Sequence, residues 1–242
     1  MKHDSRAMLA ALAVCILLGS AGPASADSPY RPYSSTLFVT SNFRLSFQRQ
    51  WSTDTVAPGA PGEAGTVSPV LLPLSVSSFR SVGDPLMPRR VAAGVPDLDE
   101  PHRRALEGNL LELLRGYEQL LDQRDEQRLK NNLAGAFLFL FRSAYCVLKD
   151  GQELSGEQQE SLLQQINASI AMGLKDRRLS DKEKQELYES VVLSGTIIRG
   201  LYSEGSTEQL KAARDLAKEL MEQWMGLTIE KVRLDGNTVR MG

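Results

Sequence analysis

Hydrophobic residues recur at helical spacing directly after residue 101. Leucines and one tyrosine return at intervals of mostly three and four, which places them on a single face of a helix. They are Leu106, Leu110, Leu113, Leu114, Tyr117 and Leu121. The pattern predicts an amphipathic helix of about six turns whose apolar face lies in a core.

The next apolar stretch, residues 132–149, is hydrophobic around its whole circumference. A helix of this kind is surrounded by its neighbours, so we expect it at the centre of a helical bundle. Its short length and the charge of Arg142 argue against a membrane span. Gly135, with Ala134 and Ala136 beside it, would let another segment of backbone approach closely.

Three further helices are predicted from their first residues. In each, a serine precedes a glutamine or glutamate by three positions, which is the spacing of a capping box. The pairs are Ser155/Gln158, Ser180/Glu183 and Ser206/Gln209. We therefore predict an all-α fold, a bundle of about five antiparallel helices over residues 101–235, followed by a tail over residues 236–242.

Residues 27–100 have a different composition. All 11 prolines of the chain lie at or before Pro101, and proline in a helix interior costs about 3 kcal/mol. We predict a largely disordered, proline-rich arm and linker here. Residues 37–47 alternate in part and could form a strand. Residues 70–74 are the most apolar part of the linker and could dock on the domain or on a partner.

Residues 1–26 have the layout of a secretory signal peptide. A basic start precedes an apolar run, and the small residues Ala24 and Ala26 mark a cleavage site before Asp27. The run is shorter than the roughly twenty residues of a spanning helix, which disfavours a permanent membrane anchor. Cys15 lies inside the run, where lipidation is not expected. We predict an exported protein, periplasmic or secreted, with no membrane span after cleavage.

The chain carries 28 basic and 30 acidic side chains, a net charge of −2. It has no strongly basic stretch of the kind that nucleic acid requires, so nucleic-acid binding is not expected. After signal cleavage Cys146 is the one remaining cysteine, and no internal disulfide can form. Its apolar neighbours in the sequence favour a buried thiol over the alternative of a reactive nucleophile.

Candidate catalytic groups are few. His102 is the one histidine left after signal cleavage and lies at the edge of the linker, so neither a zinc site nor a Cys/His pair is expected. The sequence predicts no catalytic residue, no metal site and no cofactor. Acids of the later helices fall in first turns or on polar faces, where they favour solubility over acid/base catalysis. They include Glu157, Glu160, Asp181, Glu183, Glu186 and Glu189.

Arg142 is the most informative charged residue. It follows Phe141 in the most apolar helix of the chain. One interpretation is a side chain that reaches the solvent with its charged end or forms an ion pair with an acid of a neighbouring helix, and the alternative is a contact with an anion in a groove of the bundle. Arg142 is therefore the candidate ligand contact that the sequence offers.

Short motifs in the helical half are similar to those of a known family. They are the run Asn-Leu-Ala-Gly-Ala from Asn132, the run Ser-Ala-Tyr from Ser143, and the run Ser-Asp-Lys-Glu-Lys-Gln-Glu-Leu-Tyr-Glu from Ser180. Over about residues 100–235 the chain resembles uncharacterised exported bacterial proteins with the domain of unknown function 6683. The resemblance implies a shared helical fold, but it implies no activity and identifies no site residue. Members usually have aspartate where this chain has Asn132, and either residue caps a helix.

Functions of different classes are compatible with these features. We expect a non-enzymatic binding or structural domain of the bacterial envelope, whose aromatic-rich arm contacts a protein partner. The alternative is a carboxylate-dependent hydrolase acting on envelope material, which requires two acids close together in a pocket. A third hypothesis is a holdase-like chaperone that uses exposed apolar grooves. The sequence predicts no particular oligomeric state.

Overall fold

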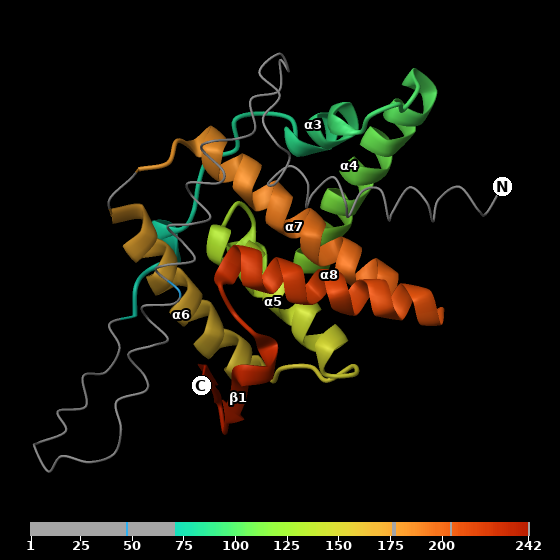
Figure 1. Cartoon of the computed structure of the whole chain (residues 1–242). Helices are drawn as coiled ribbons and strands as arrows, with labels where there is room; N and C mark the ends of the chain where they lie inside the picture. Colours follow the sequence, from blue (N-terminus) through green and yellow to red (C-terminus); the bar gives the residue numbers. More distant parts are fainter. Residues whose placement is uncertain (1–46, 48–70, 176–177, 204, 242) are drawn as a thin grey trace, which may run out of the picture.

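The computed structural model of the chain describes Phe47 and residues 71–175, 178–203 and 205–241 (Figure 1). The predicted signal peptide and, apart from Phe47, the predicted strand over residues 37–47 lie outside the described residues. The same holds for the first part of the predicted linker, up to residue 70.

Six α-helices account for most of the described residues. They are α3 (Met87–Gly94), α4 (Glu100–Gln123), α5 (Leu133–Leu148), α6 (Gly156–Lys175), α7 (Asp181–Ser203) and α8 (Thr207–Met225). The predicted all-α fold is confirmed, with α4 to α8 as the five long helices and α3 as a short addition. Within the described ranges, no helix is both long and apolar enough to cross a membrane.

Helix α5 forms the centre of the bundle, as predicted. It packs against α6, α7 and α8 (Figure 1), and every residue of α5 is buried except Phe139, Arg142 and Leu148. Phe137 and Trp224 meet edge to face with their ring centroids 6.2 Å apart. Burial of these large rings supplies much of the apolar area that stabilises the core.

The predicted helix starts are confirmed. In all three serine pairs, the serine Oγ accepts from the backbone amide three residues on, and the glutamine or glutamate side chain accepts from the serine amide. Asn132 caps α5, because its Oδ1 accepts from the Gly135 amide at 2.9 Å. Each cap satisfies amides that the helix itself leaves unpaired and contributes about 1 kcal/mol.

Residues 71–86, called the strap below, differ from the predicted linker. The strap lies on the bundle and contains a 3-10 turn, η2 (Leu74–Val76), followed by the buried residues Ser77 and Phe79. The packed chain therefore begins well before the predicted boundary at residue 101. The prediction rested on the proline and glycine content alone. It could not include the polar side chains of the bundle, which hold the strap in addition to its apolar contacts.

Buried asparagines of two helices hold the first half of the strap. Asn132 Nδ2 donates to the Leu74 carbonyl oxygen at 2.9 Å. Asn167 of α6 donates through Nδ2 to the Leu72 carbonyl oxygen at 3.0 Å, and its Oδ1 accepts from Ser77 Oγ at 2.7 Å. Both asparagines are fully buried, so these bonds replace the hydrogen bonds to water that the side chains lose on folding.

Side chains of α7 hold the second half of the strap. Gln185 Oε1 accepts from the Val82 amide at 2.8 Å. Glu189 Oε2 accepts from the amides of Leu86 and Met87, at 2.7 Å each. Helix α3 begins at Met87 without a capping side chain of its own, so the carboxylate of Glu189 caps α3 from a distant helix.

Two acids that were predicted to lie on solvated helix faces are buried in the structure. Glu186 and Glu189 are 7% and 3% exposed, and Glu186 forms an ion pair of 3.0 Å with Arg90 of α3. The prediction was wrong for these two acids. Helical periodicity does not reveal that a segment 103 residues earlier in the chain covers this face of α7.

The last described residues form a β-hairpin in place of the predicted tail. Strand β1 (Val232–Asp235) pairs antiparallel with β2 (Thr238–Met241), with Leu234 opposite Val239. Val239 is buried, and its carbonyl oxygen accepts from Gln165 Nε2 at 3.1 Å. Because Gln165 belongs to α6, the hairpin is fastened to the bundle.

Gly135 lies against the backbone of Leu129, which confirms the predicted close approach. A Cβ at residue 135 would lie 2.8 Å from Leu129 Cβ and 3.0 Å from the Leu129 carbonyl oxygen. We expect Gly135→Ala to lower the free energy of unfolding by about 1–3 kcal/mol, although alanine is the better helix former. Gly108→Ala in α4, where nothing lies within 4 Å, should raise it by about 0.5–1 kcal/mol. Urea unfolding measures both, and equal changes would contradict the close packing.

Candidate functional site

Arg142 lies on α5 with its side chain half-buried. Its Nε is buried and has no hydrogen-bond partner, and no carboxylate of the described residues forms an ion pair with it. Glu153 and Glu126 lie near enough for their charges to act on the pKa of Arg142, but neither forms an ion pair with it in the described part of the chain. An anion contact remains compatible with the structure, and it requires space beside the guanidinium group.

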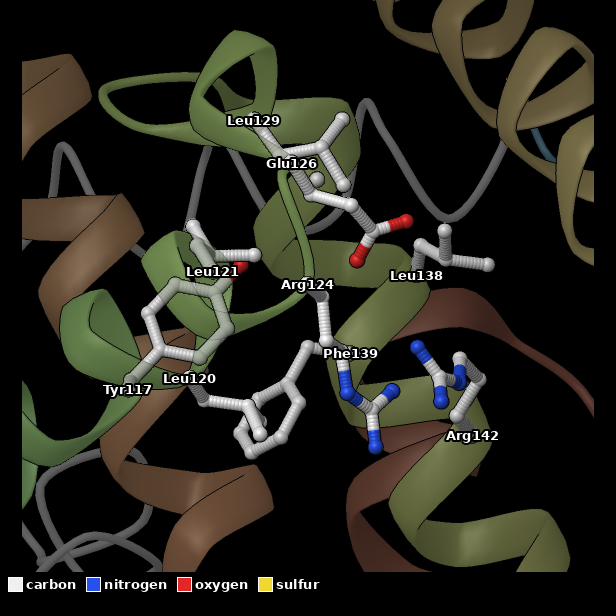
Figure 2. Close-up of a pocket in the computed structure, with 10 residues that line it drawn as sticks. Tyr117, Leu120, Leu121, Arg124, Glu126, Leu129, Leu138, Phe139 and Arg142 are labelled. Atoms are coloured by element: carbon white, nitrogen blue, oxygen red, sulfur yellow. The ribbon is translucent and has the colours of Figure 1, made fainter.

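A pocket opens beside Arg142 between α4, α5 and the turn that joins them (Figure 2). It is small, with a volume of about 10 Å³, which is room for roughly one water molecule, and it is partly open to solvent. Tyr117, Arg124, Phe139 and Arg142 are among its lining residues, and it is called the arginine pocket below.

Helix α4 supplies one wall of the arginine pocket. Tyr117, Leu120, Leu121 and Arg124 fall at positions i, i+3, i+4 and i+7, so they share one face of the helix. Tyr117 and Leu121 are buried, whereas Arg124 is exposed at the C-terminal end of α4. The apolar stripe that predicts this helix thus shares its helix face with the charged residue Arg124.

The turn after α4 returns the chain towards the arginine pocket. Asp125 has a left-handed φ of 57°, and the Glu126 amide donates to the Leu121 carbonyl oxygen at 2.8 Å. These features make a Schellman ending, in which Asp125 takes the place where glycine is most common. As a result, Arg124 and Glu126 lie on either side of the turn and both face the arginine pocket (Figure 2).

Helix α5 supplies the opposite wall through Leu138, Phe139 and Arg142. Phe139 and Arg142 are two of the few residues of α5 that are not fully buried, because the arginine pocket lies beside them. The Phe139 ring contacts the Tyr117 ring of α4, with centroids 4.6 Å apart. The two walls therefore meet through an aromatic contact.

The charges of the arginine pocket favour an anion. The guanidinium groups of Arg124 and Arg142 approach each other (Figure 2). The pKa of Arg142 is lowered, chiefly by burial and to a smaller extent by the positive charge of Arg124. Glu126 adds one negative charge to the lining, but no ion pair joins it to either arginine within the described residues. Arginine stays protonated in proteins, so two cations share a partly desolvated space that an anion would stabilise.

The hydroxyl of Tyr117 is a second unpartnered polar group in this lining. It is buried and has no hydrogen-bond partner among the described residues. Burial raises the pKa of Tyr117 well above its ordinary value, so the hydroxyl stays protonated. Most buried polar atoms in proteins are paired. Two residues of this lining, Tyr117 and Arg142, therefore each carry a buried donor without a partner among the described residues.

The structure does not bring the other candidate groups together. His102 is exposed in the first turn of α4, with its Nδ1 2.6 Å from Asp99 Oδ1. Cys146 is buried in α5, as predicted, and burial raises the pKa of its thiol. In the part of the chain that the structure describes, no group of three or more His, Cys, Asp or Glu side chains could hold a metal ion.

The acids that a hydrolase would need are buried, but their oxygens are occupied. Glu189 accepts from two backbone amides of the strap and α3, and from Gln185 Nε2 at 2.8 Å. Glu186 is paired with Arg90, and neither glutamate lines the arginine pocket. Attachment of the strap and α3 accounts for the burial of both acids without a catalytic role.

Sequence reasoning identified Arg142 but missed Tyr117, Arg124 and Glu126 as members of the same site. A signal existed for Arg124, since it extends the apolar face of α4 by one helical turn beyond Tyr117. No comparable signal existed for Glu126, whose position depends on the left-handed turn at Asp125.

Comparison with known proteins adds the family of the chain. No curated protein and no solved structure matches it. The profile of a family of unknown function, DUF6683, matches residues 4–242, a range that includes the strap and the hairpin as well as the helices. The chain therefore belongs to this family of unknown function.

Proposed function

We propose that this protein is a non-enzymatic binding domain that recognises an anion in the arginine pocket. The observation that carries the proposal is the buried Nε of Arg142, which has no partner among the described residues and lies near a second guanidinium. A carboxylate or phosphate group held between Arg124 and Arg142 would accept hydrogen bonds from both.

The free energy of the unpaired group supports this proposal. A buried donor without an acceptor costs about 1–3 kcal/mol, and more when it is charged. A ligand that supplies the acceptor recovers this free energy on binding. The side chain of Arg142 is half-buried, and the lower local dielectric there strengthens its attraction for an anion.

The proposed place of action is outside the cytoplasm, in the bacterial envelope or the medium. Support comes from the signal-peptide pattern over residues 1–26 and from the lone Cys146 that cleavage would leave. We expect the protein recovered from a periplasmic or culture fraction to begin at Asp27, as measured by N-terminal sequencing. A protein that keeps Met1 and stays in the cytoplasm would contradict export. The aromatic-rich arm, residues 27–51, is proposed to contact a protein partner there.

Replacement of Arg142 tests anion binding directly. We expect at least one of acetate, benzoate and inorganic phosphate to bind the full chain, measured by isothermal titration calorimetry at low salt. Arg142→Gln should raise its Kd at least tenfold, because hydrogen bonds to charged groups contribute about 1.5–3 kcal/mol.

The matched control is Arg115→Gln, the same substitution at an exposed arginine of α4 outside the arginine pocket. It should leave the Kd unchanged, which separates a specific contact from general attraction to positive charge at low salt. The proposal is wrong if none of the three anions binds, or if both substitutions weaken binding equally.

A further inference from the structure

We propose that the outer edge of strand β1 binds the same edge of a second copy of this chain, so that two hairpins form one four-stranded antiparallel sheet. The two copies are related by a two-fold axis that passes between their Leu234 residues. Three features carry this inference: main-chain groups that point away from the hairpin, an exposed leucine on the strand, and charges that match those of a second copy. It goes beyond the proposed function and does not depend on the arginine pocket.

The hairpin turns one edge towards the bundle and the other edge away from it. It lies beside α6, which packs against β2 (Figure 1). The Val239 carbonyl oxygen of β2 accepts from Gln165 Nε2 of α6, so this carbonyl points away from β1. In an antiparallel pair, residues directly opposite each other either both bond across the pair or both point outward. Leu234 is opposite Val239, so its amide and carbonyl point outward from the far edge.

This far edge is available for pairing. Outside the hairpin, no backbone group of the described residues bonds to the amide or the carbonyl oxygen of Leu234. A strand edge with unpaired N–H and C=O groups is a template for pairing with another chain. Two copies that pair at Leu234 in antiparallel orientation would exchange two hydrogen bonds, one from each amide to the opposite carbonyl oxygen.

The side chain of Leu234 also lacks the cover that its neighbours have. Residues two apart on a strand, and residues directly opposite on paired strands, share one face of a sheet. Leu234 therefore shares its face with Val232 and Val239, which are both buried, yet Leu234 itself is 40% exposed. In the proposed sheet the two Leu234 side chains lie opposite each other, and each removes apolar area of the other from water.

The charged residues on either side of Leu234 determine the register. With Leu234 opposite its equivalent, Arg233 of each copy is opposite Asp235 of the other, because antiparallel pairing matches the preceding residue with the following one. Both side chains are exposed. A shift of the register by two residues would place Arg233 opposite Arg233, or Asp235 opposite Asp235, and like charges opposite each other are unfavourable.

The hairpin by itself does not give Arg233 an opposite charge across the strands. Arg233 is directly opposite Arg240 of β2, and Asp235 forms an ion pair of 3.2 Å with Arg240. Two positive charges and one negative charge therefore share this exposed face. Pairing with a second copy brings its Asp235 next to Arg233, which compensates the cross-strand repulsion.

The size of the edge indicates a weak dimer. Strand β1 has four residues, and an edge of this length buries less than the roughly 1,200–2,000 Å² of stable complexes. We expect a reversible dimer with a Kd on the order of 100 μM. Sedimentation velocity of the full chain measures it, and a chain that stays monomeric up to about 1 mM would overturn the proposal.

Charge exchange tests the register. Arg233→Asp and Asp235→Arg should each raise the Kd at least tenfold, because each substitution replaces both opposite-charge pairs with like-charge pairs. An equimolar mixture of the two variants should dimerise again, since every carboxylate is then opposite a guanidinium group. Recovery in the mixture also shows that both variants are folded. A mixture that dimerises no better than the separate variants would overturn the register.

The matched control is Arg115→Asp, at an exposed arginine of α4. It changes the net charge by the same amount as Arg233→Asp, so it separates a specific pairing from general repulsion. The Kd should be unchanged in this variant. A loss of dimer equal to that of Arg233→Asp would overturn the role of β1.

Hydrogen exchange of the Leu234 amide gives a second test that needs no substitution. Exchange should slow at least threefold as the concentration of the full chain rises from well below to well above the Kd, because the amide is bonded only in the dimer. Protection that is the same at every concentration would mean that another segment of the same chain covers this edge. That outcome, like fast exchange throughout, would overturn the proposal.

Discussion

Glu189→Ala should lower the free energy of unfolding by about 3 kcal/mol. The buried carboxylate accepts from the amides of Leu86 and Met87, at 2.7 Å each, and so caps α3. Alanine leaves both amides and the Nε2 donor of Gln185 without their acceptor, and each unsatisfied buried group costs about 1–3 kcal/mol. Partial entry of water limits the sum. Urea unfolding followed by circular dichroism measures the change.

The control for this substitution is Glu157→Ala, at an exposed glutamate of the first turn of α6. It should change the free energy of unfolding by no more than about 0.5 kcal/mol. If Glu189→Ala were as mild as the control, the attachment of the strap and α3 through α7 would be refuted.

Glu189 should also make stability depend on pH. Burial raises the pKa of its carboxyl, although the hydrogen bonds from Met87, Gln185 and Leu86 act in the opposite direction. A carboxyl whose pKa is higher in the folded than in the unfolded chain stabilises the fold below the unfolded pKa. This contribution is lost as the pH rises through the folded pKa. The free energy of unfolding should therefore fall as the pH rises above about 4. Glu189→Gln, whose side chain cannot ionise, should remove this contribution to the fall, as measured by urea unfolding at several pH values.

Asn132→Asp should lower the free energy of unfolding by about 2–4 kcal/mol, although aspartate caps helices as well as asparagine does. Asn132 Nδ2 donates to the Leu74 carbonyl oxygen at 2.9 Å and to Ser78 Oγ at 3.0 Å. Aspartate replaces this donor with a second oxygen that faces the Leu74 carbonyl oxygen in a fully buried place. The loss of the bonds and the burial of a charge both oppose folding.

Asn109→Asp is the matched control, because Asn109 is exposed on α4. It should change stability by no more than about 0.5 kcal/mol. Thermal or urea unfolding of the two variants shows whether the side chain of Asn132 only caps α5 or also holds the strap. If Asn132→Asp were neutral, its amide would contribute nothing to holding the strap.

The helical bundle could be predicted from the sequence because its information is local. The apolar stripe from Leu106 to Leu121 marks the buried face of α4, and five of its six residues, all but Leu113, are buried as expected. The continuous apolar run after Asn132 marks α5 as the central helix. Serine caps mark the starts of three helices, since a capping box involves residues only three positions apart.

The strap and α3 could not be predicted in the same way. Their attachment depends on Asn167, Gln185 and Glu189, which follow their partners by 95 to 103 residues. A polar residue that is buried through a distant hydrogen bond has the same local pattern as one that faces water. The high content of proline and glycine in residues 51–101 then favours disorder when no tertiary contact is known.

The candidate site was predictable only in part. Arg142 stands out because it interrupts the most apolar helix, and this is visible without a structure. Its neighbour Arg124 lies on another helix, and the left-handed turn at Asp125 determines where Arg124 and Glu126 lie. The combination of charges that defines the arginine pocket therefore emerges only when α4 and α5 pack together.

The NMR signal of the Arg142 Nε–H group tests the arginine pocket most directly. In nitrogen-15 labelled full chain, this signal is assigned by its loss in Arg142→Gln. Titration with the anion that binds most tightly by calorimetry should shift it, with the half-maximal shift at the calorimetric Kd, while the Nε–H signal of Arg115 stays in place. Binding recorded by calorimetry with an unmoved Arg142 signal would contradict an anion site in the arginine pocket.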